Sequence, residues 1–412
     1  MSVSATLARP VGTGSPRSQR GLDWLNFFVA DVQTAFGPFI AVELSVNGWT
    51  RSAIGAVLTI NGVVGILAQA PGGALVDAVR AKRAVIGVCL GLIAAGALIF
   101  ARFPAFWLVV IAQALHGATG AVAQTALYAI GLGLVGHRVY HRRVGRSERW
   151  NTLGNAATAM GMGALGHFLS PAAPFYAAAL LCVPAGAALF TIRGADIDYR
   201  RARGAERRKE PKAARFRELL ANRRLRGFAL CVFLFQFADA SILPLASERL
   251  TEGARGLSEL VTAALVAVPQ VVTAIIAGTV AARSERWGRR PLLLGGFAVL
   301  PVRAALFAVV GTPFLLPAIQ ILGGATTAVV GIMIPLIVAD ITQGTGRYNA
   351  ALGVVLMCGL IGASLSTTVT GFLAQHLGFG AAFAGIAVVA ALATFAVWLL
   401  VPETSQEALR ED

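Results

Sequence analysis

Long apolar runs, separated by short polar segments, follow one another from residue 24 almost to the end of the chain. Each run is close to the roughly 20 residues that a helix needs to cross a bilayer. The pattern therefore predicts an all-α polytopic membrane protein with twelve transmembrane helices. Their expected bounds are 24–44, 53–76, 84–101, 105–127, 151–170, 174–192, 227–247, 258–282, 291–311, 314–338, 350–374 and 380–401.

The positions of the basic residues predict how this chain is oriented in the membrane. With both termini on the cytoplasmic side, 30 of the 35 Lys and Arg residues fall on that side. Four others (Arg51, Arg102, Arg249 and Arg255) fall in outer loops, and Arg303 falls inside a helix. Lys and Arg are enriched in cytoplasmic loops of membrane proteins. We therefore expect a multi-pass protein of the cell membrane, of the bacterial inner-membrane type, with both termini in the cytoplasm.

The composition excludes an ordinary soluble protein. Hydrophobic residues make up 56% of the chain and charged residues only 13%, whereas soluble domains carry about 25% charged residues. A net charge of +15 would suggest a nucleic-acid partner for a soluble protein, but the positions of the charges explain it here, so no nucleic-acid partner is expected. The four cysteines lie inside apolar runs without metal-ligand or disulfide spacing, so we expect neither a metal site nor a cofactor.

Three pairs of segments repeat along the chain at nearly the same distance. The segment "AARSERWGRR" (281–290) aligns with "GALVDAVRAK" (73–82) at an offset of 208, which also places Asp239 on Asp31. The segment "QILGGATTAV" (320–329) matches "QALHGATGAV" (113–122) at seven of ten positions, at an offset of 207. The repeat predicts two pseudo-symmetric six-helix bundles. The expected divisions are a cytoplasmic tail (1–23), a first bundle (24–192), a linker (193–226), a second bundle (227–401) and a cytoplasmic tail (402–412).

The expected linker differs in composition from everything around it. It contains 13 Lys or Arg and 5 Asp or Glu residues, which indicates a solvated cytoplasmic segment. Its end, "FRELLANRRLR" from Phe216, places Phe216, Leu219 and Leu220 on one helical face. This pattern predicts a short interfacial helix on the inner leaflet. A partner-binding role of the linker is the alternative.

Two copies of one short motif lie in the loops that follow the second helix of each half. The first copy has Gly73, Asp77, Ala78, Arg80, Lys82 and Arg83, and the second has Ala281, Glu285, Arg286, Gly288, Arg289 and Arg290. Both resemble the signature of the major facilitator superfamily, which reads Gly, three residues, Asp-Arg, any residue, Gly, then Arg-Arg or Arg-Lys. The resemblance extends over nearly the whole chain, and "VPET" at 401–404 resembles the C-terminal end of the family.

The resemblance implies a cytoplasmic gate at these loops. In the family, the acidic residue contacts the N-terminal end of a helix in the other half, where the helix dipole favours an anion. Asp77 is the expected gate residue of the first half, with Arg80 and Lys82 as its charge partners. The alternative is that these are ordinary loop charges that fix the topology. The second half supplies the other gate candidates, which are Glu285, Arg286, Arg289 and Arg290.

Four ionisable residues inside the expected helices are candidates for coupling. A charge at a helix centre costs about 2.5–3.5 kcal/mol, so such residues usually face a cavity or a partner. Asp31 and Asp239 occupy equivalent places in the two halves, on helices that line the central cavity in the resembled family, and we expect them to bind and release protons. A structural ion pair is the alternative for both. Arg303 then neutralises one aspartate or pairs with a neighbouring helix, and His116 is either a proton carrier or a packed histidine.

Glutamines inside the expected helices add candidate polar groups. They line a substrate path or form hydrogen bonds between helices. In the proton-coupled exporters of the resembled family, helix 4 often carries an Arg where Gln113 stands here and a Gln where His116 stands, which weakens the case for export. The candidate glutamines are Gln33, Gln113, Gln236 and Gln320, with Gln69, Gln124 and Gln270 beside them.

The function expected from these patterns is secondary transport by alternating access. We expect a monomer in the lipid bilayer that exports a small organic molecule in a proton-coupled cycle, with proton-coupled uptake as the alternative. The chain lacks the nucleophile and metal motifs of a membrane enzyme, so no enzymatic activity is expected. A receptor or scaffold would carry a large soluble domain, whereas the longest expected segment outside the membrane is the 34-residue linker.

Overall fold

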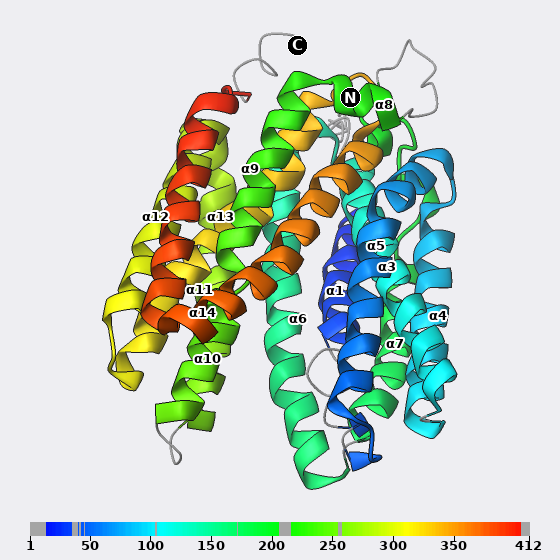
Figure 1. The fold of residues 1–412 in the computed structure, drawn as a ribbon. Helices are drawn as coiled ribbons and strands as arrows, with labels where there is room; N and C mark the ends of the chain where they lie inside the picture. Colours follow the sequence, from blue (N-terminus) through cyan, green and yellow to red (C-terminus); the bar gives the residue numbers. More distant parts are fainter. Residues whose placement is uncertain are drawn as a thin grey trace, which may run out of the picture.

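A bundle of long, nearly parallel helices makes up the computed structural model of the chain (Figure 1). The structure describes residues 14–34, 40, 43–44, 46–103, 105–170, 172–205, 216–253 and 258–404. The first half contains α1 (Pro16–Thr34), α3 (Arg51–Ala78), α4 (Lys82–Arg102), α5 (Phe106–Val135), α6 (Tyr140–Phe168) and α7 (Ala173–Thr191). The second half contains α9 (Arg223–Asp239), α10 (Ile242–Gly253), α11 (Ser258–Arg286), α12 (Arg289–Val309), α13 (Leu316–Ile341) and α14 (Tyr348–Leu400).

The described helices agree with twelve membrane crossings. Nine of them are long and apolar enough to span a membrane when α9 and α10 are taken as one span. One of these nine, α14, consists of two helices joined at Gly378, whose φ of 83° is not helical. Counting that helix twice and adding α1 and α6 gives twelve, so the expected fold class is confirmed.

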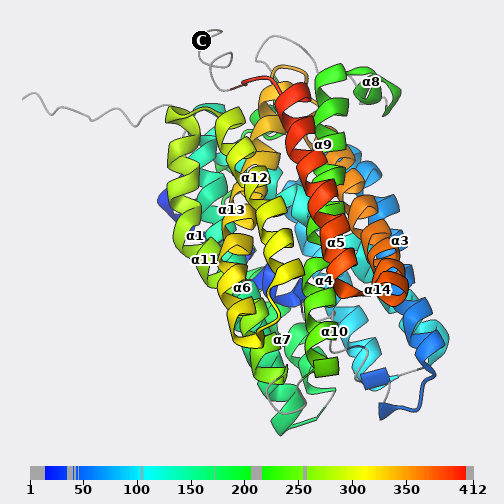
Figure 2. The same ribbon diagram turned by 60° about the vertical axis from the view of Figure 1, so that its left-hand side comes forward.

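The two halves pack as two six-helix bundles whose largest contacts are two helix pairs, with smaller contacts of α6 with α13 and of α5 with α14. Helix α14 packs against α3, and α11 packs against α6. Figure 1 and Figure 2 show the second bundle beside the first, with the short helix α8 (Phe216–Ala221) and the ends of the described chain at one end of the molecule. We call this end, which carries the linker residues 193–205, the linker end, and the opposite end the far end.

Two helices extend much further toward the linker end than the apolar pattern indicates. Helix α5 continues to Val135, where the pattern predicts an end at 127, and α6 begins at Tyr140, where it predicts a start at 151. The extra turns of α6 are polar because they form ion pairs with other helices. Arg143, for example, lies 2.6 Å from Asp23 of α1, and both side chains are buried.

The N-terminal segment also differs from the expected tail of residues 1–23. Helix α1 already begins at Pro16, and Ser18 Oγ donates a 2.6 Å hydrogen bond to Asp196 of the linker. Ser15 Oγ donates a second hydrogen bond to the same carboxylate oxygen. Both hydroxyls hold the pKa of Asp196 below its usual value. This contact therefore stabilises the fold at neutral pH and is lost as the pH falls through that lowered pKa.

Glycines allow the two bundles to touch near the linker end. A Cβ atom at Gly73 of α3 would lie 2.2 Å from the backbone oxygen of Asn349 in α14, and one at Gly353 would lie 2.3 Å from the backbone oxygen of Gln69. On the other helix pair, a Cβ atom at Gly145 of α6 would lie 2.3 Å from Cβ of Ala281 in α11. Only glycine permits backbones to approach so closely. These contacts close the linker end in this structure.

Gly73→Ala is expected to disfavour the closed linker end. The new methyl group collides with backbone, which cannot move aside as a flexible side chain can, and overpacking typically costs about 1–3 kcal/mol. The measurement is the distance between spin labels on the two bundles at the linker end, which should lengthen. Gly62→Ala is the matched control on the same helix, because nothing lies within 4 Å of its Cβ position. Equal distances in both variants would contradict the tight contact.

Candidate functional site

Asp77, at the last turn of α3, caps the first turn of α14 in the other bundle. Its Oδ1 accepts hydrogen bonds from Nδ2 of Asn349 at 2.8 Å and from the backbone N–H of Asn349 at 3.4 Å. Its Oδ2 accepts a bond from the backbone N–H of Ala350 at 2.9 Å. Asp77 is 2% exposed. A carboxylate at a helix N-terminus is stabilised by unpaired N–H groups and by the helix dipole, so this contact joins the two bundles at the linker end.

The expected charge partners of Asp77 make their direct contacts elsewhere, although the positive charge of Lys82 still attracts the Asp77 carboxylate at longer range. Lys82 is buried, but its ammonium donates to the backbone oxygens of Val76 and of Val79, the latter at 3.4 Å. It therefore caps the C-terminal end of α3. Arg80 lies over the ring of Tyr199, 5.5 Å from the centroid. Neither residue forms an ion pair with Asp77 in the described part of the chain.

A pair of buried tyrosines supports the same junction. The hydroxyls of Tyr140 on α6 and Tyr348 on α14 lie 2.8 Å apart, and both side chains are at most 1% exposed. Buried hydroxyls need such partners. This contact adds a second polar link between the bundles near the linker end.

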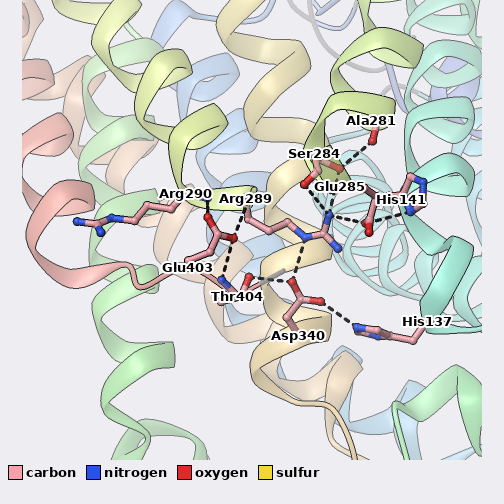
Figure 3. A network of polar contacts seen from close by, with 10 residues as sticks. All are labelled: His137, His141, Ala281, Ser284, Glu285, Arg289, Arg290, Asp340, Glu403 and Thr404. Carbon is pink, nitrogen blue, oxygen red and sulfur yellow. Dashed lines mark hydrogen bonds and ion pairs between the residues drawn. The ribbon is translucent and has the colours of Figure 1, made fainter. Parts of the chain in front are cut away.

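The second motif copy forms a larger network of ion pairs (Figure 3). Arg289 is 4% exposed and lies between two carboxylates, with Nη1 2.8 Å from Glu285 and Nε 3.0 Å from Asp340. Each carboxylate also contacts a histidine of the first bundle. His141 Nδ1 lies 3.1 Å from Glu285, and His137 Nε2 lies 2.9 Å from Asp340. The network therefore crosses from one bundle to the other.

The remaining gate candidates of the second half do not cross between the bundles. Glu403 accepts hydrogen bonds from the backbone N–H groups of Arg289 at 2.8 Å and Arg290 at 3.1 Å, so it caps the first turn of α12. The Arg290 side chain donates a 2.6 Å bond to the backbone oxygen of Trp398. Arg286 is exposed, and no ion pair of its side chain occurs among the described residues.

Two of the intramembrane candidates form an ion pair in the second bundle. Arg303 of α12 lies with Nη1 2.5 Å from Oδ1 of Asp239, the last residue of α9. The Arg303 side chain is 6% exposed and that of Asp239 is 25% exposed. A Cβ atom at Gly323 of α13 would lie 2.9 Å from Cζ of Arg303, so this glycine makes room for the guanidinium. Arg303 thus neutralises an aspartate that belongs to another helix, and for Asp239 this contact is the ion pair given above as the alternative to proton binding.

A cavity of about 250 Å³ opens beside this ion pair. Arg303 Nε and Gln320 Oε1 are buried there without hydrogen-bond partners among the described residues. A donor and an acceptor left unsatisfied in an apolar environment are costly, so they favour a polar ligand or water. The residues that line the cavity are Asp239, Ala240, Leu243, Leu265, Val266, Pro269, Gln270, Thr273, Arg303, Gln320, Gly323 and Thr327.

The other intramembrane candidates whose side chains the structure describes do not line this cavity. The side chains of Asp31 and Gln33 lie outside the described residues. Gln113 is fully buried and accepts a 3.0 Å hydrogen bond from Asn61, which is an interhelical contact within the first bundle. His116 is 9% exposed on α5. Gln236 packs against α14, where a Cβ atom at Gly359 would lie 3.2 Å from its Cγ.

The sequence interpretation missed Glu148 and His141 of the extended α6 and His137 of the short turn that precedes this helix. Glu148 is partly buried where this helix faces α13, and a Cβ atom at Gly331 would lie 2.9 Å from its Oε1. No hydrogen bond or ion pair of Glu148 occurs in the part of the chain that the structure describes. His141 and His137 contact the second bundle, as described above. A lone acidic residue and two histidines inside a basic segment were the signals that could have indicated them.

Comparison with known proteins identifies the family. The family model "Major Facilitator Superfamily" matches residues 23–283 and 228–412. The chain belongs to the major facilitator superfamily. Two uncharacterized MFS-type transporters from two strains of Mycobacterium tuberculosis are each 35% identical to this chain over 399 residues, covering 96% of both sequences. Membership assigns this superfamily protein to secondary transport of small molecules across a membrane.

Solved structures of other members share the fold. FucP in the outward conformation has a TM-score of 0.74 and 16% identity, and covers 93% of this chain and 98% of its own. The human organic anion transporter MFSD10 has a TM-score of 0.71 and 16% identity, and covers 93% of this chain and all of its own (100%). At these identities the similarity concerns the fold alone.

Proposed function

We propose that this superfamily member exports a small organic molecule in exchange for protons. In the proposed cycle the linker end faces the cytoplasm of a bacterial cell, and the two bundles open alternately toward either side of the inner membrane. The observation that carries the proposal is the Asp239–Arg303 ion pair beside a polar cavity. An ionisable pair inside a membrane protein usually marks a substrate or ion path.

The ion pair can couple a proton to a substrate because it has two charge states. Protonation of Asp239 removes the negative charge that holds Arg303, and the guanidinium then seeks another acceptor. In an exchange cycle, the substrate and the proton occupy the Asp239 carboxylate in turn. The driving force is about 2.3 kcal/mol per charge for each 100 mV of membrane potential, with the pH gradient in addition.

Proton-coupled uptake is the second candidate function, and Gln113 favours it. This residue stands where the resembled exporters carry an Arg on helix 4, and it is engaged by Asn61. In an uptake cycle, the proton on Asp239 and the substrate on Arg303 bind together and not in turn. The two cycles therefore differ in how acidification changes substrate binding: acid weakens binding in the exchange cycle and strengthens it in the uptake cycle.

Asp239→Asn is expected to abolish uphill transport while leaving downhill exchange of substrate. Asparagine has nearly the same size but cannot bind and release a proton, so the gradient no longer drives the cycle. A panel of organic compounds is first compared for accumulation in cells with and without the protein. Gradient-driven flux of the responding compound into proteoliposomes is then measured for both forms.

The matched control is Asp198→Asn, an aspartate of the linker whose side chain is 44% exposed. This control should transport as the unchanged protein does. Unchanged uphill flux in Asp239→Asn would overturn the coupling role of this residue. Stronger substrate binding on acidification would contradict the proposed export and support proton-coupled uptake.

A further inference from the structure

Two grooves lie at the linker end, one on each bundle. The first is about 460 Å³ and lies where the start of α4 meets the end of α7. The second is about 540 Å³ and lies where the starts of α9 and α12 meet the end of α14. The first is lined by Arg80, Ala81, Lys82, Arg83, Ala84, Gly87, Leu189, Phe190, Gly194 and Ile197. The second is lined by Arg223, Arg224, Arg290, Trp398, Leu399, Leu400, Val401 and Pro402.

The two grooves are related by the internal repeat of the chain. Helix α4 begins at Lys82 and α12 at Arg289, 207 residues later, so Arg83 and Arg290 are each the second residue of equivalent helices. Phe190 and Trp398 are 208 residues apart (398 minus 190). These are the offsets of the repeated segments. Each groove thus combines an arginine at the start of one spanning helix with an aromatic side chain at the end of another.

Both arginines have an unsatisfied donor. Nε of Arg83 and Nε of Arg290 are buried, and neither has a hydrogen-bond partner among the described residues. No carboxylate lines either groove. The nearby carboxylate of Glu403 is bound by backbone N–H groups of α12. Three basic side chains line each groove, and the pair of unsatisfied donors points to an anionic ligand in each of them.

The remaining walls are apolar and open to the surroundings. Phe190 is 79% exposed in the first groove, and Trp398 and Leu399 are 56% and 64% exposed in the second. These side chains lie at the ends of spanning helices, where the hydrocarbon core gives way to the headgroups. Tryptophan, as at Trp398, is enriched at that depth. A ligand that fits both parts has an anionic head and apolar chains.

We propose that each groove binds one anionic phospholipid, with its phosphate on Arg83 or Arg290 and its acyl chains along α7 or α14. Basic pockets between spanning helices are known to accept the headgroups of anionic lipids. The two lipids rest against opposite bundles at the linker end. They occupy places distinct from the Asp239 cavity.

The test counts lipids that remain bound to the purified protein in native mass spectrometry, with phosphatidylglycerol or phosphatidylcholine added. We expect up to two tightly bound phosphatidylglycerol molecules and no comparable binding of phosphatidylcholine. Arg83→Gln should weaken one site about fivefold, since one basic residue near an anionic surface contributes about that factor. Arg83→Gln with Arg290→Gln should weaken both sites. Arg83→Lys keeps the charge and should retain most of the binding.

Arg102→Gln is the matched control, because it removes the same charge from an exposed position at the far end of α4. Equal binding of the two lipids, or equal loss in Arg83→Gln and Arg102→Gln, would overturn the proposal. Displacement of phosphatidylglycerol by an equal concentration of inorganic phosphate would assign the grooves to free phosphate and also overturn it. If Arg83→Gln does not fold, the melting temperature of the unsubstituted protein is measured with each lipid instead. It should rise more with phosphatidylglycerol than with phosphatidylcholine, and an equal rise would overturn the proposal.

Discussion

Replacing Arg289 by alanine is expected to destabilise the protein by about 3–5 kcal/mol, because it leaves a buried charge without its partner. The guanidinium lies between Asp340, whose side chain is 3% exposed, and Glu285. The two histidines of the first bundle can compensate only part of this negative charge. The measurement is the melting temperature of the purified protein in detergent, which should fall clearly.

Arg286→Ala is the control for this experiment. It removes the same charge three residues earlier, but Arg286 is exposed, and substitutions at exposed positions usually change stability by less than about 0.5 kcal/mol. Equal melting temperatures of the Arg289 and Arg286 variants would show that the network contributes little. This result would also support the alternative interpretation, in which these residues are loop charges that only fix the topology.

Asp77→Asn is expected to shift the protein away from the closed linker end. The substitution removes the negative charge of the carboxylate, whose two oxygens accept hydrogen bonds from the first turn of α14. Charged hydrogen bonds of this kind contribute about 1.5–3 kcal/mol. A loss of about 2 kcal/mol lowers the equilibrium constant for closure roughly thirtyfold. The expected result is a longer distance between spin labels on the two bundles at the linker end, and slower transport.

Asp198→Asn is again the matched control, because it removes a carboxylate from the exposed linker without touching α14. Its label distance should equal that of the unchanged protein. An unchanged distance in Asp77→Asn would mean that the glycine contacts and the tyrosine pair hold the linker end closed without this residue.

The sequence was sufficient for the architecture because two independent signals agree on it. The lengths of the apolar runs predict twelve crossings, and the offset of 207–208 residues predicts two equivalent halves. The same offset located the two gate motifs. Asp77 could be placed at a helix of the other half only through the family resemblance, since a one-dimensional repeat carries no information on contacts between halves.

The parts that the sequence did not predict depend on side-chain direction and on helix length. The expected helices end at 127 and begin again at 151, so Glu148, His137 and His141 were counted as loop residues. Helix α6 in fact continues as a polar segment that contacts the other bundle, whereas the added turns of α5 are apolar and buried. The sequence left two alternatives for Arg303, and the 2.5 Å contact of its Nη1 with Oδ1 of Asp239 shows that it turns toward that aspartate.

In the proposed cycle the two bundles open alternately and the Asp239–Arg303 ion pair of the second bundle couples the proton, and this structure has the linker end closed. Alternate opening of the two ends can be measured as a pair of distances by pulsed electron paramagnetic resonance, in a background without the four native cysteines. One label pair is Ala195 with Arg286 at the linker end, and the other is Arg102 with Val309 at the far end; all four positions are exposed. Across a pH series we expect opposite changes, in which one distance lengthens as the other shortens. Distances that stay constant, or that lengthen together, would rule out alternate opening of the two ends.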